Sequence, residues 1–163
     1  MLCGSYDLIK HLAIKHPQHV HAMCGQYRFP LFAALYEGYV EVAELLLELG
    51  TNIDIRDTTG ETLLLKALSW PQKNIVDIVK FLLGHGTDAN SRNKASRSSL
   101  HLAEYGGRLE VAQMLVEHKA DVNSLDDEGK TPLHILLEYW SHDEGDVLNH
   151  TELLLEHGAE VDR

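Results

Sequence analysis

The chain has 163 residues, of which 44% are hydrophobic and 24% charged, the composition of a folded globular domain rather than of a disordered segment. Its formal net charge of −11 argues against nucleic acid and anionic membrane surfaces as partners, because both attract basic proteins. No apolar run approaches the roughly 18 residues of a membrane-spanning helix. The two cysteines cannot build a disulfide framework, so we expect an intracellular, cytoplasmic protein. We also expect a monomer.

One short pattern recurs along the chain. The sequence TPLH at residues 131–134 has weaker copies: SSLH at 98–101, TLLL at 62–65 and FPLF at 29–32. The second position of each copy falls at residues 30, 63, 99 and 132, at intervals of 33, 36 and 33. Regular spacing of this kind predicts a solenoid of stacked structural repeats.

A second position repeats near the end of each unit. It is occupied by Gly50, Gly86, Lys119 and Gly158, at intervals of 36, 33 and 39. The longer intervals place insertions between the two helices of a unit, beside Trp70 in the second unit and beside Trp140 in the fourth. Such insertions are tolerated because lengthening a surface loop costs little closure entropy.

The segment 1–24 follows the same spacing. Leu12, Ile14 and Pro17 lie 33 residues before Leu45, Leu47 and Gly50. We therefore expect a partial repeat over residues 1–24, and interpret the chain as a piece of a longer array or a larger protein. The alternative is that this irregular unit is itself the cap that such arrays need for solubility.

Four full repeats are predicted, over residues 25–56, 57–92, 93–125 and 126–163. Each contains two short antiparallel helices followed by a loop. Thr131 and Pro132 are a favourable helix start. The outer helix carries apolar residues at helical spacing, such as Val111 and Leu115. The glycines supply a left-handed helix end, which Lys119 in the third unit should weaken. Residues Asp57, Asn93 and Asp126 begin turns.

The chain resembles the ankyrin-repeat family over nearly its whole length, most strongly in GKTPLHILLEY at 129–139. The second unit departs most, with Leu63 in place of the proline and Leu65 in place of the histidine. The resemblance implies an all-α solenoid of stacked helix-turn-helix units joined by β-turn or hairpin loops. The phrase HLAIKHPQHVHAMCGQYRFPLFAAL further resembles ankyrin arrays in large fungal multidomain proteins with an NTPase signalling module.

Eleven histidines raise the question of a metal or catalytic site. In the family the histidine at the position of His101 and His134 bonds to neighbouring backbone and ties one unit to the next. His85, His118 and His157 precede the helix ends, where a base suits the helix dipole. We expect structural or solvated roles for all of these.

Ligand-like spacing occurs in one cluster of the sequence, His16, His19, His21 and Cys24, which a zinc ion could use. The repeat spacing instead places these residues at ordinary loop positions, and the sequence has no second cysteine-rich half. No nucleophile elbow, phosphate loop, dinucleotide fingerprint or HExxH pattern is present. We expect no metal, no cofactor and no enzymatic activity.

Asn90 and Asn123 end the phrases TDAN and ADVN. The family resemblance implies that the equivalent asparagine can be hydroxylated by an oxygen-dependent asparaginyl hydroxylase, with Leu82 and Leu115 at the required eight residues before. The alternative is an asparagine that stabilises the loop.

In this family partners are held on the concave side, formed by the turn tips and the exposed face of the inner helices. An aromatic residue closes the inner helix of every unit, and aromatics are enriched in binding hot spots. They could instead pack against the next unit with their polar tips in water. The candidate partner-binding residues are Tyr36, Trp70, Lys94, Arg97, Tyr105 and Tyr139.

The sequence thus predicts a module that binds a protein partner on its concave face and catalyses no reaction. The alternative is a structural spacer within a larger multidomain protein, with no specific partner of its own.

Overall fold

The computed structural model describes residues 30–57, 59–69, 74–140 and 144–162, which form eight α-helices. Within those residues no strand is formed, and an isolated antiparallel bridge joins Arg92 to Ser98. The expected all-α class is therefore confirmed. The helices are α2 (Pro30–Tyr36), α3 (Val40–Glu48), α4 (Leu63–Ser69), α5 (Ile75–Gly84), α6 (Ser99–Tyr105), α7 (Leu109–Glu117), α8 (Pro132–Tyr139) and α9 (Glu144–Glu156).

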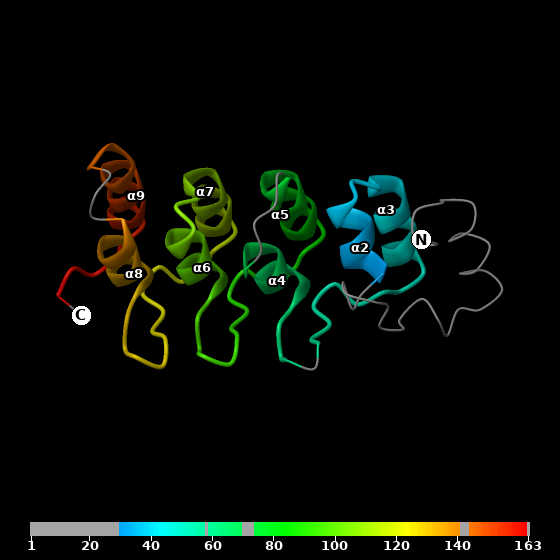
Figure 1. The fold of residues 1–163 in the computed structure, drawn as a ribbon, viewed down its shortest axis with the longest axis horizontal. Helices are drawn as coiled ribbons and strands as arrows, with labels where there is room; N and C mark the ends of the chain where they lie inside the picture. The colour runs from blue at the N-terminus through cyan, green and yellow to red at the C-terminus, as the bar shows by residue number, and fades with distance from the viewer. Residues whose placement is uncertain (1–29, 58, 70–73, 141–143, 163) are drawn as a thin grey trace.

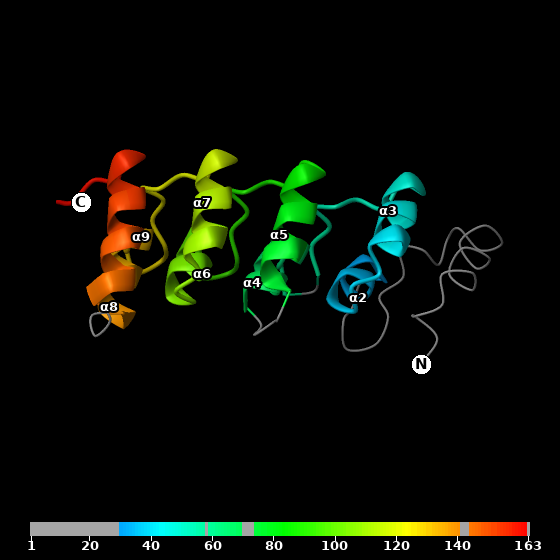
Figure 2. The ribbon, with the colours of Figure 1, turned by 90° about the horizontal axis from the view of Figure 1, so that it is seen from above.

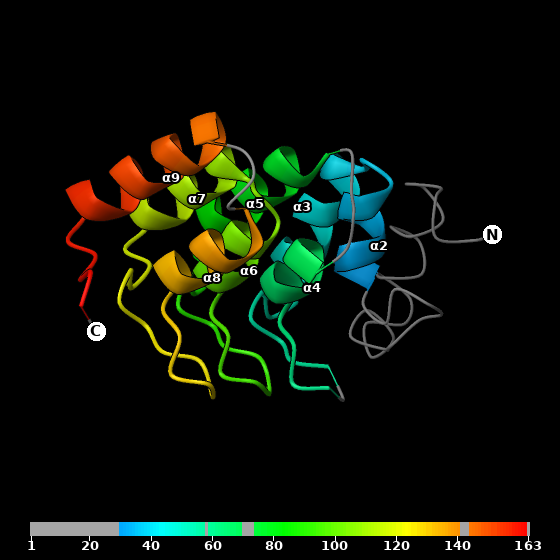
Figure 3. The ribbon, with the colours of Figure 1, turned by 60° about the vertical axis from the view of Figure 1, so that its left-hand side comes forward.

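The helices are stacked in pairs in chain order, with long loops on one side (Figure 1). We call the pairs α2–α3, α4–α5, α6–α7 and α8–α9 the first to fourth units. Seen from above, α3, α5, α7 and α9 form an outer row (Figure 2). The inner row of α4, α6 and α8 lies between the outer row and the loops (Figure 3). The partial repeat expected at residues 1–24 lies outside the described residues, and the exact unit boundaries stay a prediction.

The inner helices of the last two units begin with reciprocal hydrogen bonds. The Ser98 hydroxyl accepts from the backbone N–H of His101, and the His101 ring accepts from the backbone N–H of Ser98. Thr131 and His134 repeat this arrangement, with Pro132 in the first turn. Such a capping box satisfies backbone groups that a helix start leaves unpaired. The TPLH pattern is therefore a helix-starting device.

His101 also links two units. Its side chain is fully buried, and its Nε2 atom lies 2.9 Å from the carbonyl oxygen of Lys130 in the next unit. Burial lowers the pKa of His101, although the bond to Lys130 partly opposes this. A neutral ring that donates from Nε2 and accepts at Nδ1 fits both contacts.

The outer helices end in the left-handed region at the predicted positions. Gly86 has φ +82° and Lys119 has φ +65°. A side chain in this conformation costs about 1–2 kcal/mol relative to glycine. One residue earlier, His85 and His118 each place Nδ1 2.8 Å from the carbonyl oxygen four residues back. These histidines help to complete the helix end and are exposed.

The three described turns between units share one geometry. The side chain of Asp126 accepts from the backbone N–H groups of Glu128 and Lys130, both at 2.9 Å. Asp57 and Asn93 accept equivalent bonds in the earlier turns. These side chains replace backbone partners, as the sequence predicted for turn-forming residues.

Asn90 and Asn123 bridge neighbouring loops. The Asn90 amide donates to the carbonyl of Lys119 at 3.0 Å and accepts from the N–H of Asp121 at 2.8 Å. Asn123 makes the same two contacts to Gly158 and Glu160. This geometry gives both asparagines a loop-stabilising role, while their hydroxylation stays a prediction.

The core runs continuously through the described units, between the two rows of helices. Leu115 and Val111 lie on one buried stripe of α7, as predicted. Ala67 and Ala103 on the inner helices are fully buried. Their small side chains let α4 and α6 pack directly against one another.

Candidate protein-binding face

Three of the four predicted aromatic residues end described inner helices: Tyr36, Tyr105 and Tyr139. Their side chains are 37%, 51% and 47% exposed. The fourth, Trp70, lies outside the described residues. Large aromatic side chains that remain this exposed offer apolar area to a partner, while their hydroxyls stay in water.

Two of these rings pack together. The ring centroids of Tyr105 and Tyr139 lie 4.7 Å apart at an interplanar angle of 72°. Edge-to-face packing of this kind is the favoured geometry for aromatic pairs. Tyr36 instead packs against Phe32 of its own helix, with centroids 6.2 Å apart. The structure therefore joins the third and fourth units into one aromatic pair and leaves Tyr36 separate.

Trp140 packs closely against the backbone next to this pair. The Trp140 indole N–H donates to the carbonyl of Tyr105 at 3.1 Å. A Cβ atom added to Gly107 would lie 2.6 Å from the Trp140 ring, so the ring lies directly on this glycine. Gly107 has φ +59°, which also favours glycine. Trp140, which the sequence marks as flanking an insertion, thus contacts the backbone at Tyr105 and Gly107, next to the aromatic pair.

The cationic candidates differ from each other. Lys94 is exposed, and its side chain passes within van der Waals range of the Cβ position of Gly60 in the preceding turn. Arg97 is bound to two carboxylates, with N–O distances of 3.4 Å to both Asp126 and Glu128. Lys94 is therefore the more available of the two for a partner.

Arg97 helps to keep the Asp126 carboxylate, in the third turn, in its charged form. Burial disfavours the charge on Asp126, but bonds from the N–H groups of Lys130 and Glu128 and from Arg97 outweigh it and lower the pKa of Asp126. Lys130 continues the row, 3.0 Å from Glu128 and 2.7 Å from Glu138. The hydrogen bonds that Lys130 donates to Glu138 and Glu128 raise the pKa of Lys130 above its ordinary value. The face beside the tyrosines is thus a row of alternating charges.

A buried ion pair supports the turn of the second unit. Lys66 is 6% exposed, and its Nζ lies 2.7 Å from Asp57 Oδ2. Burial alone would raise the pKa of Asp57, yet the bonds from Lys66, Thr59 and Glu61 lower it. The sequence reading missed this pair because Lys66 occupies a core position of the inner helix, where Leu102 and Ile135 stand in the next units. Comparison of the units position by position could have revealed it.

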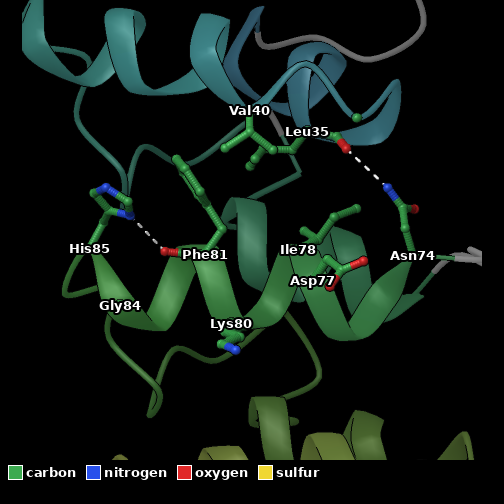
Figure 4. Close-up of a pocket in the computed structure, with 10 residues that line it drawn as sticks. Leu35, Val40, Asn74, Asp77, Ile78, Lys80, Phe81, Gly84 and His85 are labelled. Carbon is green, nitrogen blue, oxygen red and sulfur yellow. Dashed lines mark hydrogen bonds between the residues drawn. The ribbon is translucent and has the colours of Figure 1, made fainter.

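A groove opens on another side of the molecule, between the first unit and α5 (Figure 4). Its volume is about 540 Å³, with Val40 and Phe81 among its apolar walls and Leu35 and Ile78 near its base. Asn74 crosses it, and donates to the Leu35 carbonyl at 3.2 Å. Phe81 stacks on His85, with ring centroids 4.2 Å apart. No feature of the sequence predicts this groove.

Neither a metal-binding cluster nor a membrane-spanning helix is found among the described residues. In that part of the chain, no group of three or more His, Cys, Asp or Glu side chains could hold a metal ion. The cluster His16, His19, His21 and Cys24 lies outside it. Nor does any helix in the described ranges have the length and apolar character needed to cross a membrane.

Comparison with known proteins supports the repeat assignment. A sequence profile for the family "Ankyrin repeats (3 copies)" matches residues 1–93 and 72–163. The chain is 38% identical over 130 residues to human "Ankyrin repeat and SOCS box protein 6", a match that covers 76% of this chain and 30% of the human protein.

Two further relatives match a shorter part of the chain. "Ankyrin repeat and SAM domain-containing protein 6" of Mus musculus is 32% identical over 100 residues, which cover 61% of this chain and 11% of that protein. A "Putative ankyrin repeat protein" of Rickettsia felis is 31% identical over 98 residues, which cover 59% and 31%. The chain thus spans less than a third of the length of each of these relatives. The specific resemblance to fungal arrays stays a prediction. The profile covers the whole chain, and the chain belongs to the ankyrin-repeat family.

Proposed function

We propose that this chain is a protein-interaction module and that its partner binds the concave side at the pair Tyr105–Tyr139. The observation that carries the proposal is the pair itself: two half-exposed rings packed at 4.7 Å, with the Trp140 indole bonded to the Tyr105 backbone next to them. Rigid aromatic side chains lose little conformational entropy on binding and are frequent hot-spot residues. Membership of a family of interaction modules supports the same conclusion.

The neighbouring charges would set the orientation in which a partner binds this face. Lys94 offers a cation, whereas Arg97 and Lys130 are bound to carboxylates of the chain. Such rows suit a partner with mixed polar groups around an apolar anchor, because rim charges set orientation more than affinity. Tyr36 and Trp70 would extend the contact toward the first two units. The proposal assigns recognition rather than catalysis to this side, and excludes nucleic acid and membrane on the acidic charge.

The relatives suggest a setting for this module. The human and mouse proteins carry, by name, a SOCS box and a SAM domain beside their ankyrin repeats. We propose that this array likewise acts as the recognition arm of a larger intracellular protein. A spacer without its own partner is the competing function.

The test compares loss of the tyrosine pair with loss of an exposed tyrosine outside the proposed face. Tyr105→Ala/Tyr139→Ala removes the pair, and Tyr39→Ala removes a tyrosine of similar exposure, 38%, at the start of the outer helix α3. Proteins crosslinked to the wild-type chain in cells would be quantified by mass spectrometry. We expect a partner that the double variant loses by more than tenfold and Tyr39→Ala retains.

Unfolding of both variants would be followed by circular dichroism. A partner lost equally by both variants would contradict the proposed face. The absence of any partner above background for the wild-type chain would favour the spacer.

A further inference from the structure

A buried pair of titratable side chains joins the last two units. Glu104, on the last turn of α6, is 0% exposed, and His150 on α9 is 2% exposed. The His150 Nδ1 atom lies 2.6 Å from Glu104 Oε2. The other carboxyl oxygen, Oε1, is also buried and has no hydrogen-bond partner in the part of the chain that the structure describes. This contact is separate from the concave face.

The same positions are apolar in the other units. Counted along the repeat, Glu104 stands where the first two units have Leu35 and Leu68. His150 stands where the second and third units have Ile78 and Val111. All four of these residues belong to the hydrophobic core. The chain has therefore replaced both sides of one apolar contact with polar groups at a single junction.

Stability alone does not account for this replacement. A buried ionisable pair gains attraction but loses hydration, and apolar residues of similar size are often as stabilising or more so. The earlier junctions of this chain form with apolar residues at these positions. A pair of acid and base has one property that leucine and valine lack, since its charge depends on pH.

No other charged group among the described residues compensates the pair. Helix α6 packs against α4, α7 and α8, and α9 packs against α7 and α8. The charged or titratable groups of the inner helices and of the α7 start that face this region are already bound: Lys66 to Asp57, His101 to Ser98 and Lys130, Glu138 to Lys130, and Arg108 to the Leu68 carbonyl.

The other carboxylates and histidines of these helices whose side chains the structure describes face solvent: Glu110, Glu117, His134, Asp146, Glu152 and Glu156. Besides burial, His150 is the group that shifts the pKa of Glu104, and it lowers it through its hydrogen bond and its charge. The charge state of the pair therefore depends on its own protons and on burial.

We propose that the Glu104–His150 pair is a proton-operated latch that holds helix α9, and with it the fourth unit, onto the third unit. With one shared proton the pair is neutral overall, the state that a buried site holds best. When that proton leaves, a carboxylate with one unpaired oxygen remains in the interior. The junction then loses stability, and α9 opens more often.

The pH dependence follows from the number of protons on the two side chains. Burial raises the pKa of Glu104 above 4.5, although the bond from His150 partly opposes this. Between about pH 4.5 and 6.5 an unfolded chain also carries one proton, on its free histidine, so stability of the junction changes little there. Above about pH 6.5 the unfolded chain has released that proton, whereas the buried pair retains it to avoid a net charge in the interior. Stability of the junction therefore falls as pH rises above about 6.5.

Hydrogen exchange in the full chain tests the latch. Protection of the amides in α9 would be measured by mass spectrometry at about pH 5 and pH 8, relative to protection of α5 in the same molecule. Intrinsic exchange rates at each pH would come from unstructured peptides of the same sequence. In the wild-type chain we expect the α9/α5 ratio to fall by roughly tenfold or more, since tenfold corresponds to one unit of pKa difference.

Two variants distinguish the effect of Glu104 ionisation from the effect of side-chain packing at the junction. Glu104→Gln keeps a hydrogen-bonding side chain of the same shape but cannot ionise, so its ratio should stay constant or rise with pH. Glu104→Leu/His150→Val restores the apolar contact of the earlier junctions, and its ratio should change by less than about twofold. A wild-type ratio that does not fall with pH would overturn the latch. An equal fall in Glu104→Gln would do the same, because the fall could then not come from this carboxyl.

Discussion

The first and last junctions of this array use different chemistry at equivalent positions of the repeat. Between the first and second units, Leu35 and Ile78 are apolar, and an open groove of about 540 Å³ separates the outer helices (Figure 4). Between the third and fourth units, Glu104 and His150 bond at 2.6 Å. The apolar junction tolerates looseness because its contact is non-directional, whereas the polar one requires a fixed distance.

The helices also pack less closely at the first junction than at the last. Contacts of α2 with α4 and of α3 with α5 are sparse, while α6 packs extensively on α8. Trp140 closes the later junction by resting on Gly107. The array is therefore not uniform along its length, and the well-packed end also carries the proposed binding pair Tyr105–Tyr139.

The largest effect should come from the apolar core between these junctions. Leu115 is fully buried in α7. Leu115→Ala should lower the free energy of unfolding by about 2–5 kcal/mol, through lost burial and the cavity left behind. Urea unfolding followed by circular dichroism measures it. A change within experimental error would contradict the alignment of the repeats.

Two glycines at the same position of the repeat, in the first and third units, test the difference in packing between the two ends of the array. Gly38 and Gly107 both have positive φ, but a Cβ on Gly38 would meet no atom within 4 Å, whereas one on Gly107 would meet Trp140 at 2.6 Å. Gly38→Ala should cost about 1 kcal/mol for backbone strain alone. Gly107→Ala should cost roughly 2–4 kcal/mol because the ring must also move. Equal costs in urea unfolding would mean that Trp140 is not held against Gly107.

Acid should act on the second unit with the opposite sign to its effect at Glu104. The pKa of Asp57 is lowered below 3.8, so its contribution to stability is present above about pH 3.8 and lost as pH falls through the folded value. Lys66→Leu, which copies Leu102 of the third unit, removes one source of this shift. Unfolding free energy measured between about pH 2 and pH 5 should rise less steeply in the variant. An unchanged slope would show that Lys66 does not hold the charge on Asp57.

The smallest effect concerns the ends of the outer helices. Lys119 has φ +65° at the position where the other units have glycine. Lys119→Gly should stabilise the chain by about 0.5–1 kcal/mol, because relief of strain exceeds the added freedom of the unfolded chain. Gly86→Ala in the second unit should destabilise by a similar amount. Thermal unfolding of the two variants checks whether their shifts have opposite sign.

The repeat, the helix pairs and the helix ends could all be predicted from the amino-acid sequence. These features depend on local rules: Thr131 and His134 cap a helix, Asp126 folds a turn, and Val111 and Leu115 recur at helical spacing. Such signals lie within a few residues of one another. They could therefore be read from the sequence without knowing how the units stack.

Tertiary structure alone decided which distant side chains meet. Glu104 and His150 are 46 residues apart, and Trp140 reaches Gly107 only because the two units are stacked. The exposure of the tyrosines could not be predicted from the sequence either, since the same pattern of tyrosines is compatible with both burial and exposure. Contact across a junction depends on the rotation and separation of whole units, which no single repeat specifies.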